Sequence, residues 1–239
     1  MLQMQEYVPE IQERLRRAGF PRFSETLMQE LVLGPATSGA PNVVTRRKWL
    51  FADKANKTAV ALAPDFVTLE TVEYDTFDAY SEQLAAVLQV VGEAADLALS
   101  ERIGLRYIDH ITERSGLTLE QYVAPGLTGL PQQESARPAQ SLYVATGSTD
   151  VGQFVVRLVR ARGAILLPPD LQPSDLQLPT RPEGEYLLLD LDHAATVTRD
   201  FDVASVLDVF WELHDVVDGI FRSAVTPQAL TAWGAEERQ

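Results

Sequence analysis

The chain has 239 residues, of which 46% are hydrophobic and 23% are charged, a composition typical of globular proteins that excludes a chain disordered throughout. It contains no cysteine, which excludes disulfides, thiolate catalysis and cysteine-based zinc sites. The formal net charge of −14 repels nucleic-acid phosphates at long range, so we expect no nucleic-acid partner.

The sequence shows no targeting or membrane-spanning segment. Residues 1–19 mix acidic and basic side chains without an apolar stretch, unlike a secretory signal peptide. No run of about 18 apolar residues, the length of a transmembrane helix, occurs anywhere in the chain. We therefore expect a cytoplasmic protein without a membrane partner.

The first part of the chain is predicted to hold two short helices, a strand meander and one long helix. Apolar spacing favours a helix in residues 8–18, and a second helix is predicted for residues 23–33, where Ser24 could be the cap. The predicted strands are residues 43–51, 58–63 and 66–72. In residues 77–91 apolar side chains recur every three or four positions, so a long amphipathic helix follows Asp75, its expected N-cap.

A similar order of elements is predicted in the rest of the chain. The predicted strands are residues 101–111, 142–145, 154–160, 164–167 and 185–197. The predicted helices are residues 118–123, 202–224 and 226–234. We therefore expect an α+β fold: antiparallel sheets with long amphipathic helices packed on one face, and an internal duplication of a strand-meander-plus-helix unit.

The best candidate for a domain boundary is residues 125–139, a linker rich in Pro, Gly and Gln. It separates an N-terminal α+β half, residues 1–124, from a C-terminal α+β half, residues 140–239. One continuous domain, in which both halves share a sheet, is the alternative.

Familiar catalytic and cofactor motifs are missing from the sequence. It has no phosphate-binding loop, no G-x-G-x-x-G fingerprint, no G-x-S-x-G nucleophile elbow and no His-Glu-x-x-His metal motif. We therefore predict no cofactor and lean against an enzyme.

Asp190, Asp192 and His193 are the candidate metal ligands. Strand alternation puts the two carboxylates on one face, roughly 7 Å apart, where they could hold a divalent cation or act as acid and base. The interpretation that we favour is an exposed strand face, with Leu189 and Leu191 turned to the core.

Arg102, Arg106 and His110 are the candidate ligand-binding residues. They alternate onto one face of a single strand, where a row of cationic side chains could bind a small anion. The structural alternative, which we favour, is a set of ion pairs with Asp190 and Asp192.

Two clusters of basic residues stand out on the acidic background: Arg46-Arg47-Lys48, and Arg157 with Arg160 and Arg162. Basic residues near aromatics can bind single-stranded nucleic acid. Because no RNA-binding motif accompanies them, we favour local salt bridges instead.

Residues 102–111 read Arg-Ile-Gly-Leu-Arg-Tyr-Ile-Asp-His-Ile. This stretch resembles a family of sporadically distributed bacterial and archaeal proteins of unknown function, whose strand reads Arg-Ile-Gly-Leu-Arg-Tyr-Ile-Asn. Trp49, Phe51 and Tyr74 fit the same pattern, as do residues 189–192. The resemblance implies no activity, and the patchy distribution of the family implies a link to defence or toxin–antitoxin-like systems. This chain departs at Asp109, where an ionised carboxylate cannot donate the hydrogen bonds of the family's Asn.

Three functions are compatible with these residues. The one we favour is a non-enzymatic interaction or regulatory protein with a protein partner, which predicts an exposed apolar patch. The second is a binding module for a small anion or nucleotide, using Arg102, Arg106 and His110. The third is a metal-dependent hydrolase or nuclease, using residues 190, 192 and 193. A homo-oligomer is compatible with each.

Overall fold

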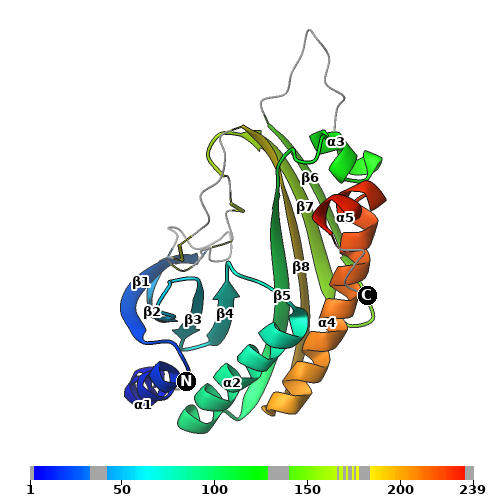
Figure 1. The fold of residues 1–239 in the computed structure, drawn as a ribbon. Helices are drawn as coiled ribbons and strands as arrows, with labels where there is room; N and C mark the ends of the chain where they lie inside the picture. Colours follow the sequence, from blue (N-terminus) through cyan, green and yellow to red (C-terminus); the bar gives the residue numbers. More distant parts are fainter. Residues whose placement is uncertain are drawn as a thin grey trace. The chain divides into compact units, whose positions relative to one another are not determined.

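The structure is a computed structural model, and it describes residues 3–32, 42–128, 140–165, 167–168, 171, 174, 176–177 and 184–234. Two four-stranded antiparallel sheets with helices confirm the expected α+β class (Figure 1). The chain forms two compact units, the first of Met1–Ala98 with Pro169–Thr180 and the second of Leu99–Pro168 with Arg181–Gln239. No helix in the described ranges is long and apolar enough to cross a membrane.

The first unit is a strand meander with one helix before it and one after it. Its elements are α1 (Met4–Arg17), β1 (Arg22–Val32), β2 (Asn42–Ala52), β3 (Thr58–Ala63), β4 (Phe66–Thr71) and α2 (Phe77–Ala95). Each strand pairs with the next, so the expected meander of β2, β3 and β4 is confirmed. The N-cap of α2 is Thr76 and not Asp75, because the Thr76 hydroxyl accepts a hydrogen bond from the amide of Ala79 at 3.2 Å.

The helix predicted at residues 23–33 is wrong, because β1 occupies this part of the chain. Its Leu, Met, Gln and Glu residues favour helices, but intrinsic propensity is a weak preference that tertiary pairing overrides. Here β1 pairs with β2 along its whole length. Phe23 packs against its direct partner Phe51, with the rings tilted and their centroids 5.3 Å apart, and this cross-strand aromatic pair stabilises the extended conformation.

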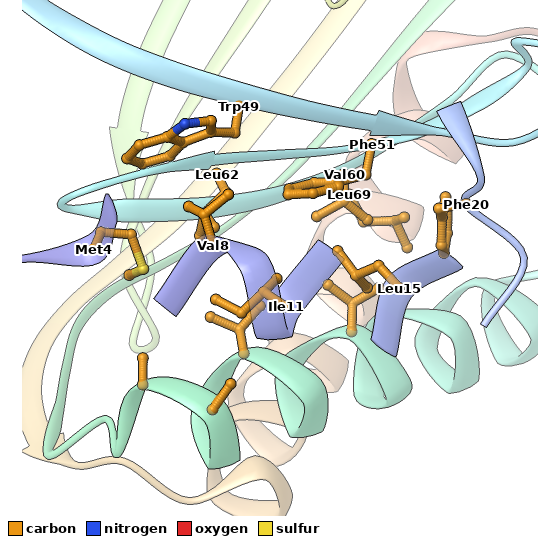
Figure 2. Close-up of a cluster of buried hydrophobic side chains, with 14 residues drawn as sticks. Met4, Val8, Ile11, Leu15, Phe20, Trp49, Phe51, Val60, Leu62 and Leu69 are labelled. Atoms are coloured by element: carbon orange, nitrogen blue, oxygen red, sulfur yellow. The ribbon is translucent and has the colours of Figure 1, made fainter. Parts of the chain in front are cut away.

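An apolar core joins α1 and α2 to one face of the first sheet. Figure 2 shows Val8, Ile11 and Leu15 of α1 pointing into the same cluster as Phe51 and Val60 of the strands, and all five side chains are buried. Complete burial of one aliphatic side chain of this size stabilises a fold by about 1.5–3 kcal/mol. Packing on the sheet therefore fixes α1, which begins four residues earlier than the sequence pattern indicates.

The second unit contains the remaining elements. They are β5 (Leu99–Ile111), α3 (Leu119–Tyr122), the 3₁₀ turn η1 (Pro125–Leu127), β6 (Ser141–Ser148), β7 (Gln153–Arg162), β8 (Glu185–Asp200), α4 (Val203–Ala224) and α5 (Pro227–Trp233). The strand order is β5-β8-β7-β6, so the first strand along the chain pairs with the last. The expected strand at 164–167 does not form at residues 164, 165 and 167, the described part of this stretch.

Because β5 pairs with β8, the boundary between the two units lies earlier in the chain than the sequence predicts. The compact units divide after Ala98, and not at the expected linker, because β5 shares a sheet with the C-terminal strands. Residues 129–139 of that linker lie outside the described residues. The last strand before the long helix is an edge strand in the first unit (β4) and an inner strand in the second (β8). The internal duplication is therefore not confirmed and stays a prediction.

Helices α4 and α5 cover one face of the second sheet (Figure 1). Their side chains Val217 and Ala229 share a buried apolar cluster with Leu189 and Leu191 of β8. Because side chains alternate along a strand, residues 190 and 192 lie on the opposite face, as the sequence pattern indicates. That opposite face carries the charged groups of the candidate site.

Candidate functional site

A buried carboxylate with two arginines lies on the face of the second sheet that α4 and α5 do not cover. Asp190 has no exposed surface, so the prediction of an exposed strand face is wrong at this residue, because arginines of both neighbouring strands lie on its carboxylate. Arg106 donates two hydrogen bonds to its two carboxylate oxygens, from Nε at 2.7 Å and Nη2 at 2.8 Å, and Arg157 donates a third from Nη1 at 2.9 Å. Arg157 is the cross-strand partner of Asp190, and Arg106 reaches Asp190 diagonally from a position opposite Asp192.

The structure does not bring the three candidate metal ligands together. Asp190 is held by guanidinium groups, Asp192 lies two residues away on the same face, and His193 lies on the opposite face. Among the described residues, no group of three His, Asp or Glu side chains is placed to hold a metal ion. The oxygens of Asp190 already accept three charge-assisted hydrogen bonds, so this cluster has the features of a structural ion network.

His193 is fully buried beneath α4, where it joins three elements. Its Nδ1 lies 3.3 Å from the carbonyl oxygen of Leu213 on α4, and its Nε2 lies 3.0 Å from Oγ1 of Thr149 in the β6–β7 turn. A carbonyl oxygen can only accept, so Nδ1 is the donor in the first contact. The imidazole therefore fixes the end of the β6–β7 hairpin to β8 and α4.

The predicted anion-binding residues share one face of β5 but lie in three different environments. Arg106 belongs to the cluster around Asp190, and the ring of His110 lies 5.0 Å from the ring of Tyr186. Arg102 makes no hydrogen bond or ion pair with any described residue, and it lines a pocket. Its guanidinium lies over Gly104, because a Cβ built there would be 3.1 Å from Arg102 Nη1. A glycine at this strand position makes room for the arginine.

The pocket beside Arg102 was not predicted from the sequence. It has a volume of about 510 Å³ and opens on the uncovered face of the sheet, between β5, β8 and the β6–β7 turn. Its polar lining residues include Arg102, Ser148, Thr149, Asp150, Asp192 and Thr196. The glycine within β5 was the only signal of it in the sequence, since a strand glycine often marks a close approach.

The β6–β7 turn forms one wall of this pocket and packs tightly on β8. The Thr149 amide donates to the carbonyl oxygen of Gly152 at 2.7 Å, and the Thr149 hydroxyl accepts from the amides of Val151 and Gly152. A Cβ on Gly152 would lie 2.1 Å from the carbonyl oxygen of Ala194. Only a glycine permits this approach, so the pocket wall depends on residue 152.

The edge strand β6 exposes apolar side chains. Leu142 is 60% exposed and Val144 is 48% exposed, both on the uncovered face, and Tyr143 is also exposed. Within the described residues β7 is the only strand that pairs with β6. The described strands form four edges, and β1, β4 and β5 all carry charged residues, whereas β6 carries none. Edge strands are usually protected by such charges, so β6 is open to pairing.

Asp109 of β5 lies on the face that the helices cover. No hydrogen bond from a described residue reaches its carboxylate, and burial raises its pKa from 3.8 to about 6. Burial without such a partner thus favours the neutral form of Asp109, whereas two arginines hold the carboxylate of Asp190.

The arginines of the two basic clusters are paired with carboxylates. Arg46 pairs with Asp65, and Arg47 lies 3.3 Å from Glu25. In the second unit Arg160 bridges Glu120 and Glu185, and Arg162 lies 3.8 Å from Glu185. These local salt bridges are the structural alternative that the sequence favours.

Comparisons with known proteins found no match, so the proposed function rests on the fold and the candidate site. No family model matches the chain, and neither a curated protein nor a solved structure does. The resemblance of residues 102–111 to a sporadically distributed family therefore stays a prediction, as does the link to defence or toxin–antitoxin-like systems.

Proposed function

We propose that the chain is a non-enzymatic interaction protein that binds its partner by adding an extended segment of the partner to β6. The observation that carries this proposal is the lack of charge on β6, combined with its exposed Leu142, Tyr143 and Val144. In strand addition the main-chain hydrogen bonds provide affinity, and alternate side chains provide specificity. An exposed apolar edge strand supplies both the main-chain hydrogen-bonding groups and the side-chain contacts.

The side chains of β6 would add to the binding free energy. Leu142 and Val144 lie on the same face of the strand and would both be covered by alternate residues of an added strand. Removing the rest of their surface from water contributes about 1–2 kcal/mol each. The backbone groups at the free edge exchange water for protein partners, which contributes about 0.5–1.5 kcal/mol for each hydrogen bond.

The partner segment is expected to be apolar in alternation and basic at its flanks. The chain carries a formal net charge of −14, so a cationic segment is attracted to it, whereas a second copy of the same chain is repelled. This charge favours a different protein over a homo-oligomer as the occupant of the edge.

The test is selection from a displayed library of random peptides of about strand length on the immobilised chain. Selected peptides are expected to alternate apolar residues, to carry Lys or Arg, and to bind at least tenfold more weakly to Val144→Lys. Val197→Lys is the matched control, because Val197 is 47% exposed on β8, outside the β6 edge. This variant is expected to bind like the unchanged chain.

Two results would overturn the proposal. Selection that enriches no peptide, or peptides that bind Val144→Lys as tightly as the unchanged chain, would exclude strand addition at β6. Sedimentation of the unchanged chain as a dimer, with Val144→Lys a monomer, would make a second copy the occupant and contradict the choice of a basic partner.

A further inference from the structure

Three charged side chains line the pocket between β5, β8 and the β6–β7 turn. Arg102, Asp150 and Asp192 all line it, and none has an ion pair or hydrogen bond with a described residue through its charged group. Two other arginines on this face of the sheet, Arg106 and Arg157, are bound to Asp190. One cation and two anions at one pocket complement a ligand that carries both signs of charge.

An α-amino acid has a size that suits these groups. The guanidinium of Arg102 lies over Gly104, which pairs with Ala194, and the backbone of Asp192 lies two residues before Ala194 on β8, roughly 7 Å away by strand rise. In an amino acid the ammonium nitrogen and the carboxylate carbon are roughly 2.5 Å apart. Charge-assisted hydrogen bonds of about 2.8 Å would join its carboxylate oxygens to Arg102 and its ammonium to Asp192.

The remaining lining excludes a nucleobase as the main recognition element. The lining residues that the structure describes include no aromatic side chain on which a base could stack. They include the hydroxyls of Ser148, Thr149 and Thr196 and the amide of Gln153, which suit a small polar ligand. The volume of about 510 Å³ lies within the range of small-molecule sites.

Contacts with His193 and Ala194 hold the β6–β7 turn, one wall of the pocket, in place. Thr149 is held by His193 through Oγ1, and the turn cannot move toward β8 because Gly152 already packs on Ala194. Binding sites that keep their geometry lose less free energy to ordering when the ligand enters.

We infer that this pocket binds a zwitterionic α-amino acid or short peptide, with the ligand carboxylate on Arg102 and the ligand ammonium on Asp192 and Asp150. Arg102 offers two parallel N–H donors, which match a carboxylate. Of β6 only its last residue, Ser148, is among the described lining residues, whereas the proposed function depends on Leu142, Tyr143 and Val144, so the two proposals are tested independently.

The experiment is a calorimetric titration of the full chain with a panel of free α-amino acids and dipeptides. For the best binder, the matching acid without the amino group and the matching amine without the carboxylate are each expected to bind at least tenfold more weakly. Arg102→Gln and Asp192→Asn are expected to lose at least tenfold in affinity. Arg114→Gln, an exposed arginine in the turn after β5, is the control and should bind normally.

Three outcomes would overturn the inference. These are a panel in which nothing binds at millimolar concentration, a deaminated acid or inorganic phosphate that binds as tightly as the amino acid, and an Arg102→Gln variant with unchanged affinity. Melting curves of each variant separate loss of binding from loss of folding, and Val144→Lys should bind the amino acid like the unchanged chain.

Discussion

The two edge strands of the second sheet, β5 and β6, differ in the charge of their side chains. Strand β5 carries Glu101, Arg102, Arg106 and Asp109, and one of these arginines fixes it to β8 through Asp190. Strand β6 carries no charge, exposes apolar side chains and pairs on one side only with a described strand. Charges on an edge must be desolvated before another strand can add, so β5 is protected and β6 is not. The difference teaches that net charge alone does not decide which surface of an acidic protein binds partners.

The largest expected effect concerns the ion cluster that secures β5. Asp190→Ala leaves Arg106 and Arg157 without their buried carboxylate, and breaking such a buried pair costs about 3–5 kcal/mol. Asp192→Ala is the matched control on the same face of β8 and should cost less than about 1 kcal/mol. Urea unfolding of both variants measures the difference. Equal costs for the two substitutions would show that the cluster does not secure the strand.

The next effect is a pH dependence at Asp109 of β5. Its folded-state pKa of about 6 lies above the ordinary value of 3.8, so the folded chain binds a proton more tightly than the unfolded chain. The free energy of unfolding should therefore fall as the pH rises from about 4 to about 6, and level off above. Asp109→Asn, which removes the ionisable group, should stabilise the chain by up to about 3 kcal/mol at pH 7 and have no effect near pH 4.

Unfolding curves of Asp109→Asn at both pH values test this sign. Asp215→Asn, which removes an exposed carboxylate of α4, is the control and should change stability little at either pH. Destabilisation by Asp109→Asn at pH 7 would contradict the account, because it would mean that the ionised carboxylate has a stabilising partner.

A smaller effect is expected at the end of β6. Thr149→Val removes the hydroxyl that contacts buried His193, and leaving such a polar atom unpaired costs about 1–3 kcal/mol. Ser148→Ala, at the neighbouring exposed position of the same hairpin, should cost less than about 0.5 kcal/mol. Thermal melts of the two variants give the comparison. A Thr149→Val variant as stable as Ser148→Ala would show that His193 does not fix the hairpin.

The smallest effect on stability is expected on the β6 edge itself. Val144→Lys places a charge on a side chain that is already about half in water, so it should change the free energy of unfolding by less than about 0.5 kcal/mol. Urea unfolding checks this. A loss of several kcal/mol would mean that Val144 belongs to the core, which would contradict its assignment to an interaction surface.

Local patterns in the sequence were enough to predict the faces of the strands. Alternation places Asp190 and Asp192 opposite Leu189 and Leu191. Of the predicted ion pairs between β5 and these two carboxylates, the structure shows Arg106 with Asp190. These predictions succeed because side-chain direction in a strand follows from residue number alone.

The features that the sequence did not reveal depend on contacts between distant residues. The pairing of β1 with β2 overrides the helix propensity of residues 23–33. The pairing of β5 with β8 decides the unit to which residues 99–111 belong. The pocket depends on how the turn at Gly152 packs on Ala194, and composition indicates only that these residues form a turn.

Hydrogen–deuterium exchange at the amides of Ser141–Ser148 tests strand addition to β6 most directly, measured with and without a peptide selected on the immobilised chain. The account predicts that the edge-facing amides of β6 exchange quickly in the free chain and slowly in the complex, whereas the exchange of β5 stays unchanged. Protection that appears on β5 and not on β6 would contradict the proposed interaction edge.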